Sequence, residues 1–436
     1  MARAARLSLA LLMATGMWLY VQHVLIPYEK LQGPMRQSPR GNLSDLYPRW
    51  LGARELLLHH RDPYGADITR EIQVGYYGRE LDPNRPGDPK DQQGFAYPVY
   101  VVLMLAPTVT LRFSVVHEAF FWFFAALTGA SVVLWIRALQ WRISLTGTVI
   151  WILLTLSCFP AIQGLKLQQL SLLVAALLAA SMFALVRRWF VLTGILLALA
   201  TIKPQLVFLV VLWLGMWVLA SWRDRQRLFW SFAITMIVLL AAGEVLLPGW
   251  IGEFRAAMKA YYRYTGGGIS VLDVLLSPLW GRITAAGLVV MLAMLVWQNR
   301  RAAESSAAFQ WTMCFILATT LLLIPMFAPY NQLLLVPGLM MAVRASQQLW
   351  RRDRVTRFFC LLTAASVVWP FLSASCLVVA LAFLPGPTVQ RAWGPPLYPS
   401  LAIPLAIFAL LLAARNILMV DAPEQRAEPE STRLAT

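Results

Sequence analysis

Charged residues are scarce in this chain of 436 amino acids. They make up 13% of the sequence, whereas hydrophobic residues make up 59% and the mean hydropathy is +0.62. Soluble domains carry about 25% charged residues, and a water-soluble fold of this size could not bury so much apolar surface. The scarcity of charge therefore excludes a soluble globular protein and predicts an all-α polytopic membrane protein.

Cysteine and histidine are also rare, with four of each. The cysteines lie inside apolar runs, where they are typical of small packing residues. The histidines show no ligand spacing relative to acidic residues. We therefore expect no disulfide framework, no metal site and no cofactor. These residues are Cys158, Cys314, Cys360, Cys376, His23, His59, His60 and His117.

Long apolar runs are abundant, and twelve of them approach the length of about 17–25 residues that crosses a bilayer. The first is too long for a signal-peptide core, so we expect an uncleaved span. The segment 97–111 is short and interrupted by prolines, which predicts a re-entrant or interfacial helix. The twelve runs are 6–26, 114–136, 143–162, 168–186, 189–203, 204–221, 228–247, 274–298, 307–328, 330–345, 356–383 and 398–419.

The net charge of +16 is mainly a topology signal. With the N-terminus inside, about half of the 37 basic residues fall in the cytoplasmic connections and tails, as the positive-inside rule requires. In the outer loop 27–95 the basic and acidic residues balance, so this loop carries no net charge. We therefore predict cytoplasmic termini, one membrane domain over 1–420 and a disordered tail over 421–436. The basic charge does not indicate a nucleic-acid partner.

This topology places the unusual polar residues at the outer ends of the spans. A charge at the bilayer centre costs at least about 2.5–3.5 kcal/mol, so such residues face a cavity or an interface. A transporter would be expected to scatter polar groups through the midplane. The pattern instead predicts a one-sided site that opens to the outer face. The residues are Glu118, Lys166, Gln168, Gln169, Lys203, Glu244, Asp273, Tyr330, Asn331 and Gln332.

The first outer loop, 27–95, contains a predicted amphipathic helix that begins after Ser44 or Asp45. Asp45, Arg49, Gly52, Glu55 and His59 recur at helical spacing and form one polar face. Either Ser44 or Asp45 could cap this helix. A second helix is expected around 67–79. Asp62 would form a turn between the two, and His59 and His60 would lie on the surface.

Lys203 stands between two apolar runs, immediately before Pro204. It could extend to the membrane interface, as lysines at span ends do. Alternatively it could point into the outer cavity and hold a phosphate, because a fixed cation stabilises a desolvated anion. Lys166 has the same placement, and Gln168 or Gln169 could donate hydrogen bonds to a sugar.

The second outer loop, 248–272, carries Arg255, Lys259 and Arg263 at four-residue spacing, on one face of a predicted helix. Tyrosines interleave with them. The pattern is typical of an interfacial helix that contacts headgroups. It also allows recognition of a lipid-phosphate donor or a sugar.

Taken in order, these motifs resemble glycosyltransferase family 87, a GT-C-type group of membrane enzymes. The similar segments are SDLYPRWLGARELLLHHRDPY, FAYPVYVVLMLAP, LKLQQLSLLVAALLAA and LALATIKPQLVFLVV, with weaker similarity in GGGISVLDVL and PYNQLLLVP. Two positions depart from the family pattern. The family has a pair of aromatic residues after the aspartate, where this chain has Leu46-Tyr47. It has a Gln-Asn pair where this chain has Gln168-Gln169.

The resemblance implies a GT-C-like bundle of about 12 transmembrane helices in a bacterial inner membrane, with the active site on the periplasmic or extracellular face. It implies a mannosyltransferase-like enzyme that uses a polyprenyl-phosphate sugar and a lipid or glycan acceptor. Asp45 would be the catalytic base, and Lys203, Lys166, Arg255 and Arg263 would bind the donor phosphate. Sugar or acceptor contacts would come from Asp62, Tyr64, Gln168, Gln169, Tyr330 and Asn331.

Three other functions remain open from the sequence. One is a transporter or flippase of lipid-linked saccharides, although midplane charges and internal inverted symmetry, which such a protein would be expected to show, are not evident. Another is an O-antigen-ligase-like transferase, which is similar in span number but carries its large outer loop late in the chain. A relative that binds lipid-linked sugar without catalysis is the third.

Overall fold

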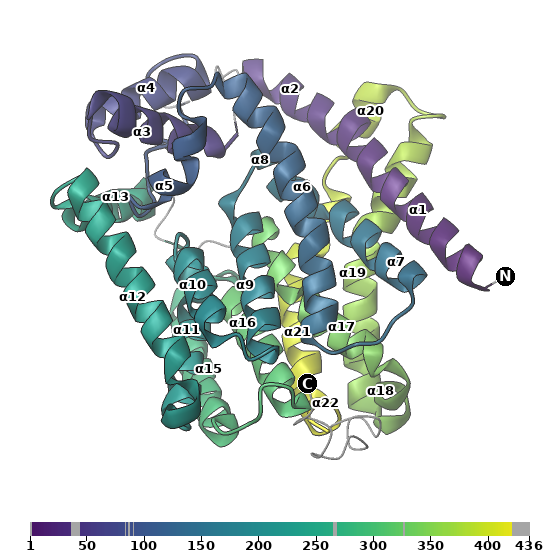
Figure 1. Cartoon of the computed structure of the whole chain (residues 1–436). Coiled ribbons are helices and arrows are strands. Elements are labelled where there is room, and N and C mark those ends of the chain that lie inside the picture. The colour runs from purple at the N-terminus through teal and green to yellow at the C-terminus, as the bar shows by residue number, and fades with distance from the viewer. Residues whose placement is uncertain are drawn as a thin grey trace.

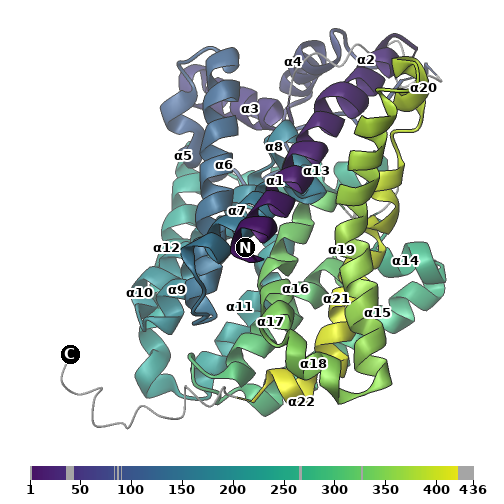
Figure 2. The ribbon, with the colours of Figure 1, turned by 90° about the vertical axis from the view of Figure 1, so that its right-hand side faces the viewer.

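The computed structural model describes residues 2–35, 44–82, 84–85, 88–89, 91–264, 268–325 and 328–420. Within these ranges every regular element is helical, which confirms the predicted all-α class. The longer helices form an upright bundle, and α3, α4 and α13 cover one end of it (Figure 1). A quarter turn of the view shows α18 and α22 at the opposite end (Figure 2).

The bundle is built from apolar helices because its outward-facing side chains meet lipid rather than water. Among the described residues, six helical stretches are long and apolar enough to cross a membrane, and a seventh counts if a bent pair is one span. The chain is therefore a polytopic helical membrane protein. The principal bundle helices are α1 (Ala2–Tyr20), α6 (Phe113–Ala138), α7 (Leu145–Ser157), α9 (Leu170–Val186), α10 (Phe190–Ala200), α11 (Pro204–Leu219), α12 (Trp222–Leu246), α15 (Pro278–Asn299), α16 (Ala307–Leu323), α17 (Val336–Arg344), α19 (Arg354–Ala380) and α21 (Ala402–Ala413).

Shorter helices connect the bundle and cover its ends. Both predicted helices of the first outer loop are present, as α3 and α4, and 97–111 contains only a short helix and a 3-10 turn, too short to cross. The connecting elements are η1 (Val21–Leu25), α2 (Ile26–Met35), α3 (Leu46–His59), α4 (Ala66–Tyr77), α5 (Val101–Leu105), η2 (Ala106–Thr108), α8 (Phe159–Leu167), α13 (Trp250–Tyr264), α14 (Val271–Leu276), η3 (Pro329–Leu335), α18 (Ser346–Arg352), α20 (Gly386–Arg391), η4 (Pro395–Ser400) and α22 (Arg415–Leu418).

The number of full-length spans is smaller than the twelve predicted. The 143–162 run is broken, because Cys158 is extended and a new helix begins at Phe159, with Pro160 in its first turn. As a result α7 and α8 meet at a 57° bend. The 330–345 run is a 3-10 turn followed by the nine-residue α17. Four further apolar helices, α9, α10, α11 and α16, have only 10–17 residues. Hydropathy found these apolar segments but could not show where the backbone breaks. The predicted tail, 421–436, lies outside the described residues.

The most buried helix is α16, in which nearly every side chain from Ala307 to Leu322 is shielded. A helix that is apolar on all sides is expected to be surrounded by other helices. Its neighbours include α11, α15 and α21. Because α16 is central and ends at Leu323, the segment that follows it lies near the bundle axis, at the end that α3 and α13 cover.

Close helix packing depends on small residues, and Gly194 is the clearest case. A β-carbon at Gly194 of α10 would stand 2.7 Å from both the carbonyl oxygen of Leu228 and the amide nitrogen of Phe232 on α12. Backbone atoms cannot rotate away, so the helices would have to separate. We expect Gly194→Ala to lower the free energy of unfolding by about 1–3 kcal/mol, measured as a lower midpoint in detergent. Gly215→Ala on α11 is the matched control, because its β-carbon would meet nothing within 4 Å. Equal midpoints for the two variants would contradict this packing.

Candidate functional site

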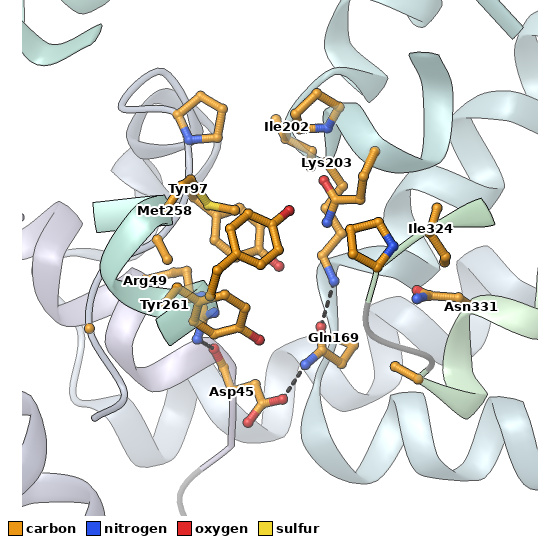
Figure 3. A pocket seen from close by; sticks show the side chains of 18 of the residues that line it. Asp45, Arg49, Tyr97, Gln169, Ile202, Lys203, Met258, Tyr261, Ile324 and Asn331 are labelled. Atoms are coloured by element: carbon orange, nitrogen blue, oxygen red, sulfur yellow. Dashed lines mark hydrogen bonds between the residues drawn. The ribbon is translucent and has the colours of Figure 1, made fainter. Parts of the chain in front are cut away.

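A cavity of about 150 Å³ lies at the end of the bundle that α3 and α13 cover. It is enclosed by segments far apart in the sequence: the start of α3, the stretch 91–98, the α8–α9 and α10–α11 connections, α13 and the region around η3. Figure 3 shows Asp45, Arg49, Gln169 and Lys203 pointing toward one another inside it. We call this cavity the polar pocket.

Asp45 lines the polar pocket from the N-cap position, immediately before α3. Its backbone amide donates to the Leu167 carbonyl at 3.0 Å, which ties the start of α3 to the end of α8. Its side chain makes no cap hydrogen bond. Instead, Ser44 Oγ accepts from the Leu46 amide at 3.3 Å, and Asp45 Oδ2 accepts from Gln169 Nε2. Of the two predicted caps, Ser44 supplies the side-chain contact, and the carboxylate of Asp45 faces the pocket.

Lys203 reaches the same pocket from the α10–α11 connection and is only 7% exposed. Its ammonium donates to Gln169 Oε1 at 2.8 Å and to Ser171 Oγ at 2.7 Å. It also lies 5.6 Å and 5.2 Å from the ring centroids of Tyr97 and Tyr330. Pro204 starts α11 immediately afterwards, which fixes the position of the lysine. The side chain is therefore buried in the pocket rather than extended to an interface.

Arg49 supplies a second buried cation, one turn after Asp45 on α3. One guanidinium nitrogen donates to the Asp45 carbonyl at 2.8 Å, and the guanidinium carbon lies 4.7 Å from the Tyr97 ring centroid. Its Nε is buried and has no hydrogen-bond partner within the described chain. The residue is 9% exposed. Arg49 thus retains unused hydrogen-bonding capacity at the pocket.

The two cations are not neutralised by an ion pair among the described residues, although Asp45 and Asp91 also line the pocket. Lys203 donates only to an amide and a hydroxyl oxygen, so its protonated form has one of three N–H groups available. Burial, together with the charge of Arg49, lowers the pKa of Lys203 to about 7, and the charge of Asp45 opposes this shift. A bound anion would hold the lysine in its charged form. Burial raises the pKa of Tyr97 and of Tyr261 to about 12, so both rings face the pocket as neutral phenols. Buried cations are usually paired. The arrangement therefore favours an anionic ligand.

A chain of hydrogen bonds connects the carboxylate to the cation. Gln169 donates to Asp45 through Nε2 and accepts from Lys203 through Oε1. Ser171 accepts from Lys203 and donates to Asn331 Oδ1 at 2.8 Å. Gln169 and Asn331, both predicted from the sequence, therefore hold the acidic and basic groups at a fixed separation.

Several predicted site residues lie outside the polar pocket. Lys166 forms an ion pair with Glu29 on the partly exposed surface. Gln168 has positive φ and donates to the carbonyl of His117. Both therefore serve local structure at the end of α8.

Asp62 and Tyr64 shape the turn between α3 and α4. Asp62 Oδ1 accepts from the Tyr64 amide at 2.9 Å, and the Tyr64 hydroxyl donates to the Tyr97 carbonyl at 2.6 Å. Asp62 is the turn-former that the sequence also allowed. Tyr64 acts on the pocket only indirectly, by holding the segment that carries Tyr97.

Arg255 and Arg263 lie on the exposed face of α13, away from the polar pocket. The face that covers the pocket carries Phe254, Met258 and Tyr261. Their spacing of four and three residues is the apolar stripe of an amphipathic helix. Helical phase could therefore have identified the covering face from the sequence.

Three residues that contact the groups of the polar pocket are not identified as site residues by the sequence. Arg49 was placed on the polar face of the first helix, but its orphan Nε depends on tertiary packing. Tyr97 lies in the FAYP segment, where no spacing reveals that its ring stands beside both cations. Ser171 lies in an apolar run and reads as a packing residue. All three contact the pocket groups directly.

An apolar groove of about 310 Å³ adjoins the polar pocket between α11 and α16. It shares Pro204, Gln205, Ile324 and Pro325 with the pocket. Phe208, which is 60% exposed, lines it farther along α11. The pocket and groove together offer a polar end and an apolar end, as an amphiphile with an anionic head would require.

No cluster of three or more histidine, cysteine, aspartate or glutamate residues that could hold a metal ion occurs in the described ranges. Comparisons of the whole chain with family models, with curated proteins and with solved structures found no match.

Proposed function

We propose that this protein is a GT-C-type membrane glycosyltransferase that moves a sugar, a mannose-like hexose or a pentose, from a polyprenyl-phosphate donor to a lipid or glycan acceptor. One observation carries the proposal. Two buried basic side chains that form no ion pair among the described residues, Arg49 and Lys203, share a pocket with the carboxylate of Asp45, and this pocket joins an apolar groove.

The cations suit the donor's phosphate. Arg49 and Lys203 offer unused N–H groups in a shielded pocket, where electrostatic attraction is stronger than in water. During transfer, negative charge grows on the departing phosphate oxygen, and fixed donors stabilise such charge most effectively when they are already in position. Because these groups accept the developing charge, the mechanism does not require a metal.

Asp45 suits the role of general base. It would remove the proton from the acceptor hydroxyl as that oxygen bonds to the anomeric carbon. The bond from the anomeric carbon to the phosphate oxygen breaks at the same time, and polyprenyl phosphate departs with the electron pair. Direct displacement inverts the anomeric centre. Gln169 forms hydrogen bonds with both Asp45 and Lys203. These bonds would keep the base at a fixed distance from the lysine that binds the phosphate.

The apolar groove suits the polyprenyl chain. It leads from the pocket along α11 and α16, two apolar helices, so the chain could remain in contact with lipid while the head enters the pocket. The cationic pocket then lies on the non-cytoplasmic face in the orientation that the arginine distribution predicts.

Turnover tests the proposal. Purified protein is incubated with radiolabelled polyprenyl-phosphate mannose, glucose or arabinose and a native lipid extract, and products are separated by chromatography. We expect one donor to yield a glycosylated product with inverted anomeric configuration. If no donor is consumed while the protein moves the intact lipid-linked sugar across liposomes, the transporter function replaces this proposal.

A further inference from the structure

A second, larger cavity lies lower in the bundle than the polar pocket, beside the lower half of α19. It has a volume of about 570 Å³ and is enclosed by α1, α7, α17, α18 and α19. Its walls include Met13, Trp151, Leu154 and Phe371, and it shares no lining residue with the polar pocket. Cavities of about 300–1,000 Å³ commonly hold small ligands. We call it the lower cavity, since Figure 1 shows α17, α18 and the neighbouring part of α19 low in the bundle.

The lower cavity opens toward the lipid-facing surface. Its lining residues Val343, Trp350 and Leu361 are 46%, 51% and 57% exposed. A sealed core would shield these side chains. In a membrane protein, an apolar cavity with exposed lining residues is filled by lipid chains, because water would be costly there.

Two arginines precede the lining residues of this cavity on α19. On α19, Arg357 precedes the lining residues Cys360 and Leu361 by three and four positions, and Arg354 lies one turn earlier, so all share one helix face. Both arginines are exposed and form no ion pair among the described residues. The neighbouring carboxylate, Asp353, is already engaged by Arg352 and by the Thr356 amide.

One lining residue beyond these arginines carries a buried polar atom. Thr363 lines the cavity and is 3% exposed, yet its Oγ1 has no hydrogen-bond partner within the described chain. It lies six residues after Arg357, roughly 9 Å along the helix. A hydroxyl in an apolar setting loses free energy unless it is paired, so this group is suited to donate to a ligand oxygen.

We propose that the lower cavity binds one anionic phospholipid. An acyl chain occupies the cavity, the headgroup phosphate lies at Arg354 and Arg357, and Thr363 donates to an ester carbonyl. Basic sites between membrane helices bind anionic headgroups by this combination of charge and apolar area. The site is separate from the polar pocket, so it does not depend on the proposed transfer reaction.

Native mass spectrometry of the purified protein tests this site. The probes are phosphatidylglycerol and phosphatidylcholine with identical acyl chains. We expect phosphatidylglycerol to bind more tightly by on the order of tenfold. Equal binding of the two lipids would overturn the proposal.

Variants then locate the lipid. Arg354→Gln/Arg357→Gln should remove the preference for phosphatidylglycerol, and Ala364→Phe, which fills the cavity, should weaken binding of both lipids. The matched control is Arg300→Gln/Arg301→Gln at the end of α15, which should retain the preference. Unfolding midpoints confirm that each variant is folded. The proposal fails if the control loses the preference equally, or if Ala364→Phe binds lipid as the parent does.

Discussion

Replacing Asp45 with asparagine should reduce sugar transfer by about 10²–10⁴-fold, the contribution typical of a positioned general base. Asparagine has nearly the same shape, and its side-chain oxygen can still accept from Gln169 Nε2 as the carboxylate does. It cannot take a proton from the acceptor hydroxyl. The variant should therefore fold, and should bind donor with unchanged affinity, while its turnover number falls.

Single-turnover and steady-state rates with the active donor measure this effect. Asp62→Asn is the matched control, because Asp62 lies outside the polar pocket and an asparagine retains the hydrogen bond to the Tyr64 amide. Its rate should stay close to that of the parent protein. A turnover number in Asp45→Asn comparable to that of Asp62→Asn would remove Asp45 from the role of base.

Replacing Lys203 with methionine should weaken donor binding by about 2–4 kcal/mol, roughly 30- to 1,000-fold, the loss typical when one partner of a buried charge pair is removed. Methionine fills nearly the same space, so the change removes the ammonium without opening a large cavity. The loss should reside in the affinity for polyprenyl phosphate, with or without a sugar attached. Gln169 and Ser171 also lose their donor, and a small fall in stability should accompany the change.

Equilibrium binding of fluorescent polyprenyl phosphate in detergent measures this loss. The control is Lys166→Met, because Lys166 pairs with Glu29 outside the polar pocket. This variant should bind the lipid as the parent does. If Lys166→Met weakens binding as much as Lys203→Met, the anion site does not lie at Lys203.

Much of the fold follows from the sequence. Apolar runs located the bundle helices, and a polar face at helical spacing located α3 to within a residue or two. The sequence did not show where an apolar run is one continuous helix and where it is broken into shorter ones. Pro160 and Pro329 lie in apolar surroundings, so hydropathy passes over them, whereas the backbone bends or tightens there.

The candidate site was predictable in part. Asp45, Gln169, Lys203, Tyr330 and Asn331 meet because residues at the same ends of helices meet at the same end of a bundle. Two of the predicted residues lie apart from the polar pocket for a different reason. For Arg255 and Arg263 the sequence placed the helix correctly, but the apolar face of α13 turns toward the pocket and carries the arginines outward.

The orphan Nε of Arg49 and the neutral partners of Lys203 required coordinates, because they depend on contacts between α3, the 91–98 segment and the α8–α9 connection. The lower cavity also required coordinates, since most of its lining residues are apolar side chains of the kind that any membrane helix carries. Sequence patterns report the faces of single helices, while these sites form where several helices meet.

The binding site of the donor is best tested by a structure of the protein with bound polyprenyl-phosphate sugar, determined by electron cryomicroscopy. We expect the phosphate within hydrogen-bond distance of Lys203 Nζ and the Arg49 guanidinium. The first isoprene units should lie along α11 and α16, and the anomeric carbon should be open to Asp45. A phosphate bound elsewhere, with the polar pocket empty, would contradict this expectation.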